Sequence, residues 1–340
     1  MKILKKLYLA TATFLLMLAS FAQAAEVNIY SARKEDLIKP ILEVFEQQTE
    51  IKVNLITGKA DALLQRLISE GKNSPADILI TTDAGRLYRA KKAKVLQTTE
   101  SETLSKAIPE QYRDPEGYWF GLTLRARPIV YAYDRVKPEM LSTYEALAQA
   151  EWKKKICIRS SDNIYNQSLV ASMLAQDKED ETLDWLNSLV KNFARPPQGG
   201  DRDQIKAIAS GQCDIALVNN YYLGKMLTSS NEAEVAAANT VKIFWPNQDG
   251  RGTHVNISGA AITASSKNKE NALKLLEFLV SDDAQLWYAE KNLEYPIKPG
   301  IQASEILKSW GEFKADSLSL HKLGEFNADA VMLMDRARWK

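Results

Sequence analysis

The stretch VNIYSARKEDLIKPILEVFEQQTEIKVNLITGKADALLQRLISEGKNSPADILITT, residues 27–82, decides the fold class. Short β-rich runs alternate in it with amphipathic helical patterns, in the order 27–30, 37–48, 51–56, 60–70 and 77–81. Strands that alternate with helices are typical of a parallel sheet, because parallel neighbours need a crossover connection. The sequence therefore predicts an α/β fold.

The second half of the chain repeats this pattern. Strand-like runs are followed by further helical patterns, and the predicted elements are 155–159, a helix after Tyr165 to 175, 182–190, 204–209, 214–218, a strand at 259–264, and helices at 270–279, 282–291 and 327–339. Ser281 is a plausible N-cap for the helix that follows it. Extended segments at 121–133 and 241–244 are expected to carry the chain between two lobes, and such crossings imply a hinge.

The first residues have the pattern of a secretory signal peptide. Three lysines precede the apolar run 7–19, and Ala22-Gln23-Ala24 follows it, so we expect cleavage after Ala24. The run is too short to span a bilayer and no cysteine lies at the cleavage site, so we expect a soluble protein in the periplasm. The whole chain has a formal net charge of +1 and no basic runs, which argues against nucleic acid as a partner.

The chain contains only two cysteines, Cys157 and Cys213. In an exported protein two cysteines most simply pair with each other. The alternative is two separate buried thiols. Metal-binding thiols are less favoured, because neither cysteine lies in a C-x-x-C motif.

Two polar loops carry the candidate site residues. SSDNIYNQ (160–167) and VNNYYLG (218–224) each follow a predicted strand and open a helix, and strand ends of this kind meet at the crevice of an α/β lobe. Tyr165, Tyr221 and Tyr222 therefore present three phenols there. Tyrosines more commonly pack as amphipathic side chains with hydrogen-bonded hydroxyls, and spacing alone does not exclude that alternative.

Phenolate oxygen suits Fe(III), because a hard cation prefers anionic oxygen to sulfur. A metal charge stabilises the phenolate and displaces its proton, so binding should weaken in acid. Three phenolates neutralise Fe(III) but fill only half of an octahedral shell. Arg125 and Arg127 alternate in LTLRARP (122–128) and should share one face, where they could hold a carboxylate or carbonate. The alternative role for these arginines is interlobe salt bridges.

Motifs along most of the chain resemble the ferric-binding proteins of bacterial iron ABC importers. They are NIYSAR (28–33), SPADILITTDAGRL (74–87), GLTLRAR (121–127), KICIRSSDNIYNQSLVASML (155–174), GQCDIALVNNYYLG (211–224) and ISGAAIT (257–263). The resemblance implies a type II periplasmic-binding-protein fold, with two transferrin-like lobes, a hinge and an interlobe cleft. The predicted N-terminal lobe is 25–124 plus 248–300, and the C-terminal lobe is 125–247 plus 301–340.

The resemblance also implies functional residues. Tyr165, Tyr221 and Tyr222 are the expected Fe(III) ligands, Arg127 the first candidate to hold a synergistic carbonate, and Arg125 the second. The resemblance also favours a disulfide between Cys157 and Cys213 that joins the two ligand loops. It implies a non-enzymatic, monomeric carrier that delivers iron to an inner-membrane ABC permease.

One departure from the family concerns the N-terminal lobe. Many relatives have His-Tyr after the arginine of the first motif, whereas this chain has Arg33-Lys34-Glu35-Asp36. Glu35 and Asn163 are candidate additional ligands, although a solvated helix start is the favoured role for Glu35. We therefore predict a site that depends on an exogenous anion and Arg127, in a partly open cleft.

Two other functions are the alternatives to iron binding. One is a receptor for an anion or polyamine on the same scaffold, with Tyr221 and Tyr222 stacked on the ligand. The other is an exported hydrolase, but the sequence has no Gly-x-Ser-x-Gly or His-Glu-x-x-His motif and no Ser-x-x-Lys with companions. His254 and His321 lack partners at the spacing of a zinc site.

Overall fold

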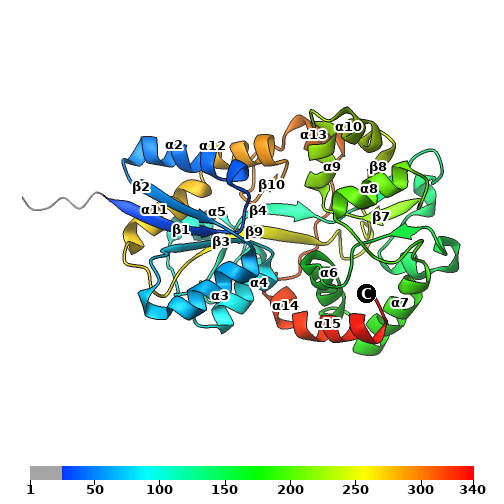
Figure 1. Cartoon of the computed structure of the whole chain (residues 1–340), viewed down its shortest axis with the longest axis horizontal. Helices are drawn as coiled ribbons and strands as arrows, with labels where there is room; N and C mark the ends of the chain where they lie inside the picture. Colours follow the sequence, from blue (N-terminus) through cyan, green and yellow to red (C-terminus); the bar gives the residue numbers. More distant parts are fainter. Residues whose placement is uncertain (1–24) are drawn as a thin grey trace, which may run out of the picture.

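The computed structural model describes residues 25–340, so the predicted signal peptide lies outside the described residues. Two sheets with surrounding helices form two lobes that lie next to each other (Figure 1). The first sheet contains β1 (Glu26–Ser31), β2 (Lys52–Thr57), β3 (Ile78–Thr82), β4 (Phe120–Ala126), β9 (Val255–Ile262) and β10 (Tyr295–Pro296). The second contains β5 (Ile129–Ala132), β6 (Ile156–Cys157), β7 (Ile215–Leu217) and β8 (Val241–Phe244). The predicted two-lobed α/β fold is confirmed.

The helices that pack around the first sheet are α2 (Lys39–Thr49), α3 (Ala60–Glu70), α4 (Ala84–Lys92), α5 (Glu102–Ala107), α11 (Lys269–Leu279) and α12 (Asp282–Trp287). Those around the second are α6 (Ile164–Leu174), α7 (Glu179–Lys191), α8 (Asp201–Ala209), α9 (Asn220–Leu227), α10 (Glu232–Ala238), α13 (Glu305–Ser309) and α15 (Asn327–Arg336). The short helix α14 (His321–Glu325) packs against both α4 and α6. Among residues 25–340, no helix is long and apolar enough to cross a membrane.

The first sheet has the order β10-β4-β9-β3-β1-β2 and is mixed rather than fully parallel. β1 pairs in parallel with β2 and β3, as the alternation in residues 27–82 predicts. β9 is antiparallel to both β3 and β4. Every residue of β9 is buried, so this strand is the centre of the lobe.

The second sheet has the order β6-β7-β5-β8 and is buried on both faces. Along β5, Ile129 and Tyr131 belong to one apolar cluster, while Val130 and Ala132 belong to another. This alternation follows from the two-residue period of a strand. Helices therefore cover both sides of the sheet.

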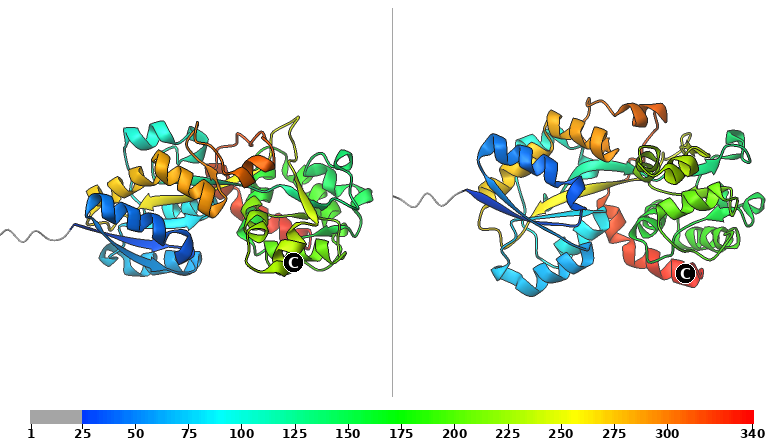
Figure 2. Two further views of the ribbon diagram at one scale, coloured as in Figure 1. Left: turned by 90° about the horizontal axis from the view of Figure 1, so that it is seen from above. Right: turned by 45° about the horizontal axis from the view of Figure 1, so that its top comes forward.

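The chain passes between the lobes at three places. β4 and β5 belong to different sheets and only residues 127–128 separate them, which confirms the predicted crossing within 121–133. The second passage runs from β8 to β9 through residues 245–254. The third follows β10, and the chain ends in α15, which packs on α6 and α7 (Figure 2).

Short 3-10 and π turns connect several of these elements. The 3-10 turns are η1 (Glu35–Leu37), η2 (Gly71–Asn73), η3 (Glu110–Tyr112), η4 (Pro138–Met140), η5 (Glu145–Ala148) and η6 (Ala150–Trp152). The predicted helix 282–291 is an α-helix only to Trp287 and then becomes the π turn η7 (Tyr288–Asn292). Ser281 caps it as predicted, because its hydroxyl accepts a hydrogen bond from the backbone of Ala284.

Candidate metal centre

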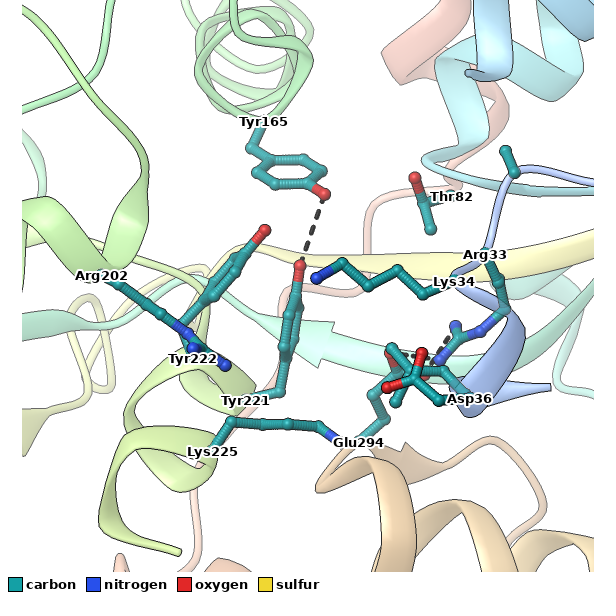
Figure 3. A pocket seen from close by; sticks show the side chains of 12 residues that line it. Arg33, Lys34, Asp36, Thr82, Tyr165, Arg202, Tyr221, Tyr222, Lys225 and Glu294 are labelled. Carbon is teal, nitrogen blue, oxygen red and sulfur yellow. Dashed lines mark hydrogen bonds and ion pairs between the residues drawn. The ribbon is translucent and has the colours of Figure 1, made fainter. Parts of the chain in front are cut away.

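The three predicted tyrosines lie at the starts of two neighbouring helices. Tyr165 is the second residue of α6, and Tyr221 and Tyr222 are the second and third residues of α9. α6 follows β6 and α9 follows β7, and these two strands pair in parallel, so both helices begin at the same edge of the sheet. The hydroxyls of Tyr165 and Tyr221 are 3.3 Å apart, and the rings of Tyr221 and Tyr222 have centroids 4.3 Å apart (Figure 3).

The phenols face a cleft between the lobes. The N-terminal lobe lines it with Ala32, Arg33, Lys34, Asp36, Leu37, Thr82 and Glu294, and the C-terminal lobe with Tyr165, Arg202, Tyr221, Tyr222 and Lys225 (Figure 3). Among residues 25–340, no cluster of His, Cys, Asp or Glu has the arrangement of a metal site. The three phenol oxygens are therefore the clustered oxygen donors that the cleft offers to a cation.

Three guanidinium groups surround the ring of Tyr165. The central carbons of Arg125, Arg159 and Arg127 lie 5.3, 5.6 and 6.0 Å from the ring centroid. Burial alone would raise the pKa of Tyr165, but the charge of Arg125 and the hydrogen bond with Tyr221 lower it below the ordinary value. Tyr165 is thus the phenol that ionises most readily.

The other two phenols hold their protons more tightly. Burial and the charge of ionised Tyr165 raise the pKa of Tyr221 well above its ordinary value. The same two causes raise the pKa of Tyr222. One phenolate in the cluster therefore makes the next harder to form, unless a cation arrives to offset the repulsion.

The side chain of Arg127 is buried and donates hydrogen bonds to neighbouring side chains. It donates hydrogen bonds to Asn166 at 2.5 Å, to Asn219 at 3.0 Å and to Asp201 at 3.3 Å. Asp201 also accepts a hydrogen bond of 2.8 Å from Arg159. All these partners lie on the C-terminal lobe, so Arg127 belongs to an ionic network that supports the tyrosines.

Arg125 is buried but largely unpartnered. One of its terminal nitrogens donates to the backbone carbonyl of Ile257. Its Nε and Nη1 atoms are buried and have no hydrogen-bond partner among residues 25–340. Unpaired buried donors are costly in a folded protein, and an anion at this position would satisfy them.

The two additional candidate ligands lie away from the phenol hydroxyls. Glu35 is in η1, its side chain is 57% exposed, and it forms a salt bridge of 3.0 Å with Lys39. It lines a separate hollow beside α2, outside the cleft. Asn163 is the residue before α6, and its side chain makes no capping hydrogen bond and does not line the cleft.

Sequence reasoning missed Glu294, which reaches the cleft wall from the segment after η7. Its carboxylate accepts hydrogen bonds of 3.0 and 3.1 Å from Arg33 and a further one from Thr123. Arg33 and Glu294 are 261 residues apart, and no local pattern marks a glutamate that will be buried by such a partner. The structure therefore adds a buried ion pair to the N-terminal wall of the cleft.

Residues 73–310 match the family model of the bacterial extracellular solute-binding proteins. The chain belongs to this family. Iron uptake protein A1 of Synechocystis is 50% identical over 315 residues, which cover 93% of this chain and 88% of that protein. A Trichodesmium protein, solved in complex with iron and citrate ligands, has a TM-score of 0.91 and 50% identity, with 93% of this chain and 100% of that one covered. The ferric binding protein from Campylobacter jejuni has a TM-score of 0.88 and 40% identity, covering 92% and 100% of the two chains.

A disulfide supports the tyrosine loops of this solute-binding protein. Cys157, at the end of β6, is bonded to Cys213, two residues before β7, and their Cα atoms are 5.8 Å apart. The predicted pairing is confirmed. Because β6 leads to Tyr165 and β7 leads to Tyr221, the bond joins the two strands from which the candidate ligands extend.

Replacing both cysteines with alanine should lower the free energy of unfolding of the solute-binding protein by about 2–5 kcal/mol. The bond closes a loop over a sequence separation of 56 residues, so its loss frees the unfolded chain. Denaturant-induced unfolding of the double variant and of the wild type measures the difference. Reduced wild type is the control and should match the variant, whereas equal stability of all three samples would contradict the prediction.

Proposed function

We propose that the chain is a ferric-ion carrier that binds Fe(III) through Tyr165, Tyr221 and Tyr222 and delivers it to an ABC importer. The observation that carries the proposal is the gathering of three phenols in the interlobe cleft, without a cluster of other metal ligands in the described residues. The iron-related names of several relatives support it.

An exogenous anion completes the coordination shell in this proposal. Three phenolates supply half of an octahedral shell, and carbonate or another carboxylate supplies further oxygens. The unpaired Nε and Nη1 atoms of Arg125 support this residue as the anion holder in preference to Arg127, because both terminal nitrogens of Arg127 already have partners. The relative from Trichodesmium was solved in complex with iron and citrate ligands, and citrate is a carboxylate anion.

The carrier would act in the periplasm after export, as a monomer without enzymatic activity, and release iron to an inner-membrane permease. Its lobes would be those predicted from the sequence, except that residues 125 and 126 belong to β4 of the first sheet. The phenol ligands would lie on the C-terminal lobe. A polyamine ligand is disfavoured, because Lys34, Arg202 and Lys225 already bring positive charge to the cleft.

Absorption spectroscopy tests the metal ligands directly. Wild type loaded with Fe(III) should show a visible charge-transfer band from tyrosinate to iron, and Tyr222→Phe should weaken and shift it. Tyr133→Phe is the matched control, because Tyr133 is 53% exposed and does not line the cleft. A loaded wild type without this band would overturn the proposal.

A further inference from the structure

The cationic side chains of the cleft differ in whether they have partners. Arg33 pairs with Glu294 at 3.0 Å, and Arg202 pairs with Glu234 at 3.2 Å. Lys225 donates a hydrogen bond of 3.0 Å to the backbone carbonyl of Lys291. The ammonium group of Lys34 lines the same cleft, yet it makes no hydrogen bond or ion pair with any residue in 25–340.

The local backbone directs Lys34 into the cleft. Arg33 is buried and fixed by Glu294, and the carbonyl of Lys34 accepts a hydrogen bond of 3.0 Å from the backbone of Leu37 as η1 begins. Figure 3 shows the side chain of Lys34 extending from the N-terminal lobe toward the hydroxyl of Tyr221. The next residue, Glu35, instead pairs with Lys39 outside the cleft.

The charge of the proposed iron complex requires a cation at this position. Three phenolates cancel the charge of Fe(III), so any anion that joins the shell makes the whole complex negative. Arg125, the proposed anion holder, is buried in β4 with its guanidinium 5.3 Å from the ring centroid of Tyr165, and it supplies one positive charge. The free ammonium of Lys34 lines the cleft that the three phenols face, so it can neutralise a second negative charge. Its three donors on a flexible stem adapt to anions of different shape.

We propose that Lys34, on the wall of the N-terminal lobe, is a second cation beside Arg125 that binds the anion that accompanies Fe(III). The cleft then selects iron together with a carbonate or polycarboxylate that carries more than one negative charge. This inference rests on the proposed function, because it assumes that iron is held by the phenolates. It assigns to the N-terminal lobe a cation that binds the anion.

Iron release into excess chelator tests the role of Lys34. The charge-transfer band is followed after mixing, for wild type, Lys34→Ala and Lys34→Arg, each loaded in carbonate, in citrate or in acetate. Lys34→Ala should release iron about tenfold faster in carbonate and in citrate, the loss expected for one charge-assisted hydrogen bond. In acetate, a monoanion, its release should match that of the wild type. Lys34→Arg should largely restore retention in carbonate and in citrate.

Controls separate this inference from the proposed function. Lys39→Ala removes an equal charge that lies outside the cleft and should release iron as the wild type does. Lys34→Ala should keep the position of the band, because the three phenols are intact. Equal release rates of Lys34→Ala and wild type in all anions would overturn the role of Lys34 alone, and so would a uniform acceleration that includes acetate. Absence of the band in wild type would overturn the proposed function and this inference together.

Discussion

Phenylalanine in place of Tyr165 is expected to lower the affinity for Fe(III) by on the order of a thousandfold. This loss is larger than the roughly 10- to 100-fold loss of metal affinity that follows when an outer-shell partner is removed, because here a direct ligand is removed. The change removes one oxygen and leaves the aromatic ring that lies against Arg125 and Arg159. It removes the phenol with the lowered pKa, which is the one of the three whose proton the ion displaces most easily. Competition against a chelator of known affinity measures the loss.

The matched control for this prediction is again Tyr133→Phe, which should bind as tightly as the wild type. Circular dichroism and thermal unfolding should show that Tyr165→Phe keeps the fold, because the ring still packs and only its hydroxyl is lost. A folded Tyr165→Phe protein with unchanged affinity would contradict the assignment of Tyr165 as a ligand.

The apparent affinity for Fe(III) is expected to rise by at least about 100-fold per pH unit between pH 5 and 8, tenfold for each proton displaced from Tyr221 and Tyr222. The pKa values of Tyr221 and Tyr222 are raised above their ordinary value of 10, so both phenols are protonated throughout this window in the iron-free protein. Coordination favours the phenolates and releases these protons. Acid therefore opposes binding, and alkali favours it.

Proton release during loading checks this prediction most directly. A pH-stat titration of wild type and of Tyr222→Phe with the same ferric source cancels the protons that come from hydrolysis of the iron. The variant should release about one proton fewer per bound ion, since it lacks one phenol. Equal proton release by the two proteins, with iron bound in both, would show that Tyr222 does not coordinate as a phenolate.

Elements with a strong local pattern could be predicted from the sequence. The helix α3 spans Ala60–Glu70 as predicted, because its apolar residues recur at helical spacing and Gly71 ends it with a left-handed backbone. The start of β9 was missed by four residues. Asn256 and Ser258 are polar and interrupt the apolar run, yet both are buried. Asn256 donates to Asp83, which is 173 residues away, and the local sequence carries no sign of that contact.

The candidate site also has features that the sequence predicts and features that it does not. The clustering of Tyr165 with Tyr221 and Tyr222 follows from their positions after two strands, which the sequence shows. The difference between Arg125 and Arg127 does not, because alternation along the chain gives both arginines the same face. Arg127 is neutralised by Asp201, which is 74 residues away on α8, and only the packing of that helix brings the two together.

The placement of all three phenols on one lobe separates two kinetic steps. The distances among Tyr165, Tyr221 and Tyr222 are set by α6, α9 and the disulfide beneath them, so a rotation of the lobes about the crossing at residues 127–128 leaves these distances unchanged. In the proposed carrier, the ion can then reach all three phenols before the lobes close. The residence time of the ion then depends on how long the N-terminal lobe keeps the cleft closed. Variants of the N-terminal wall should therefore alter the dissociation rate of the ion more than its association rate.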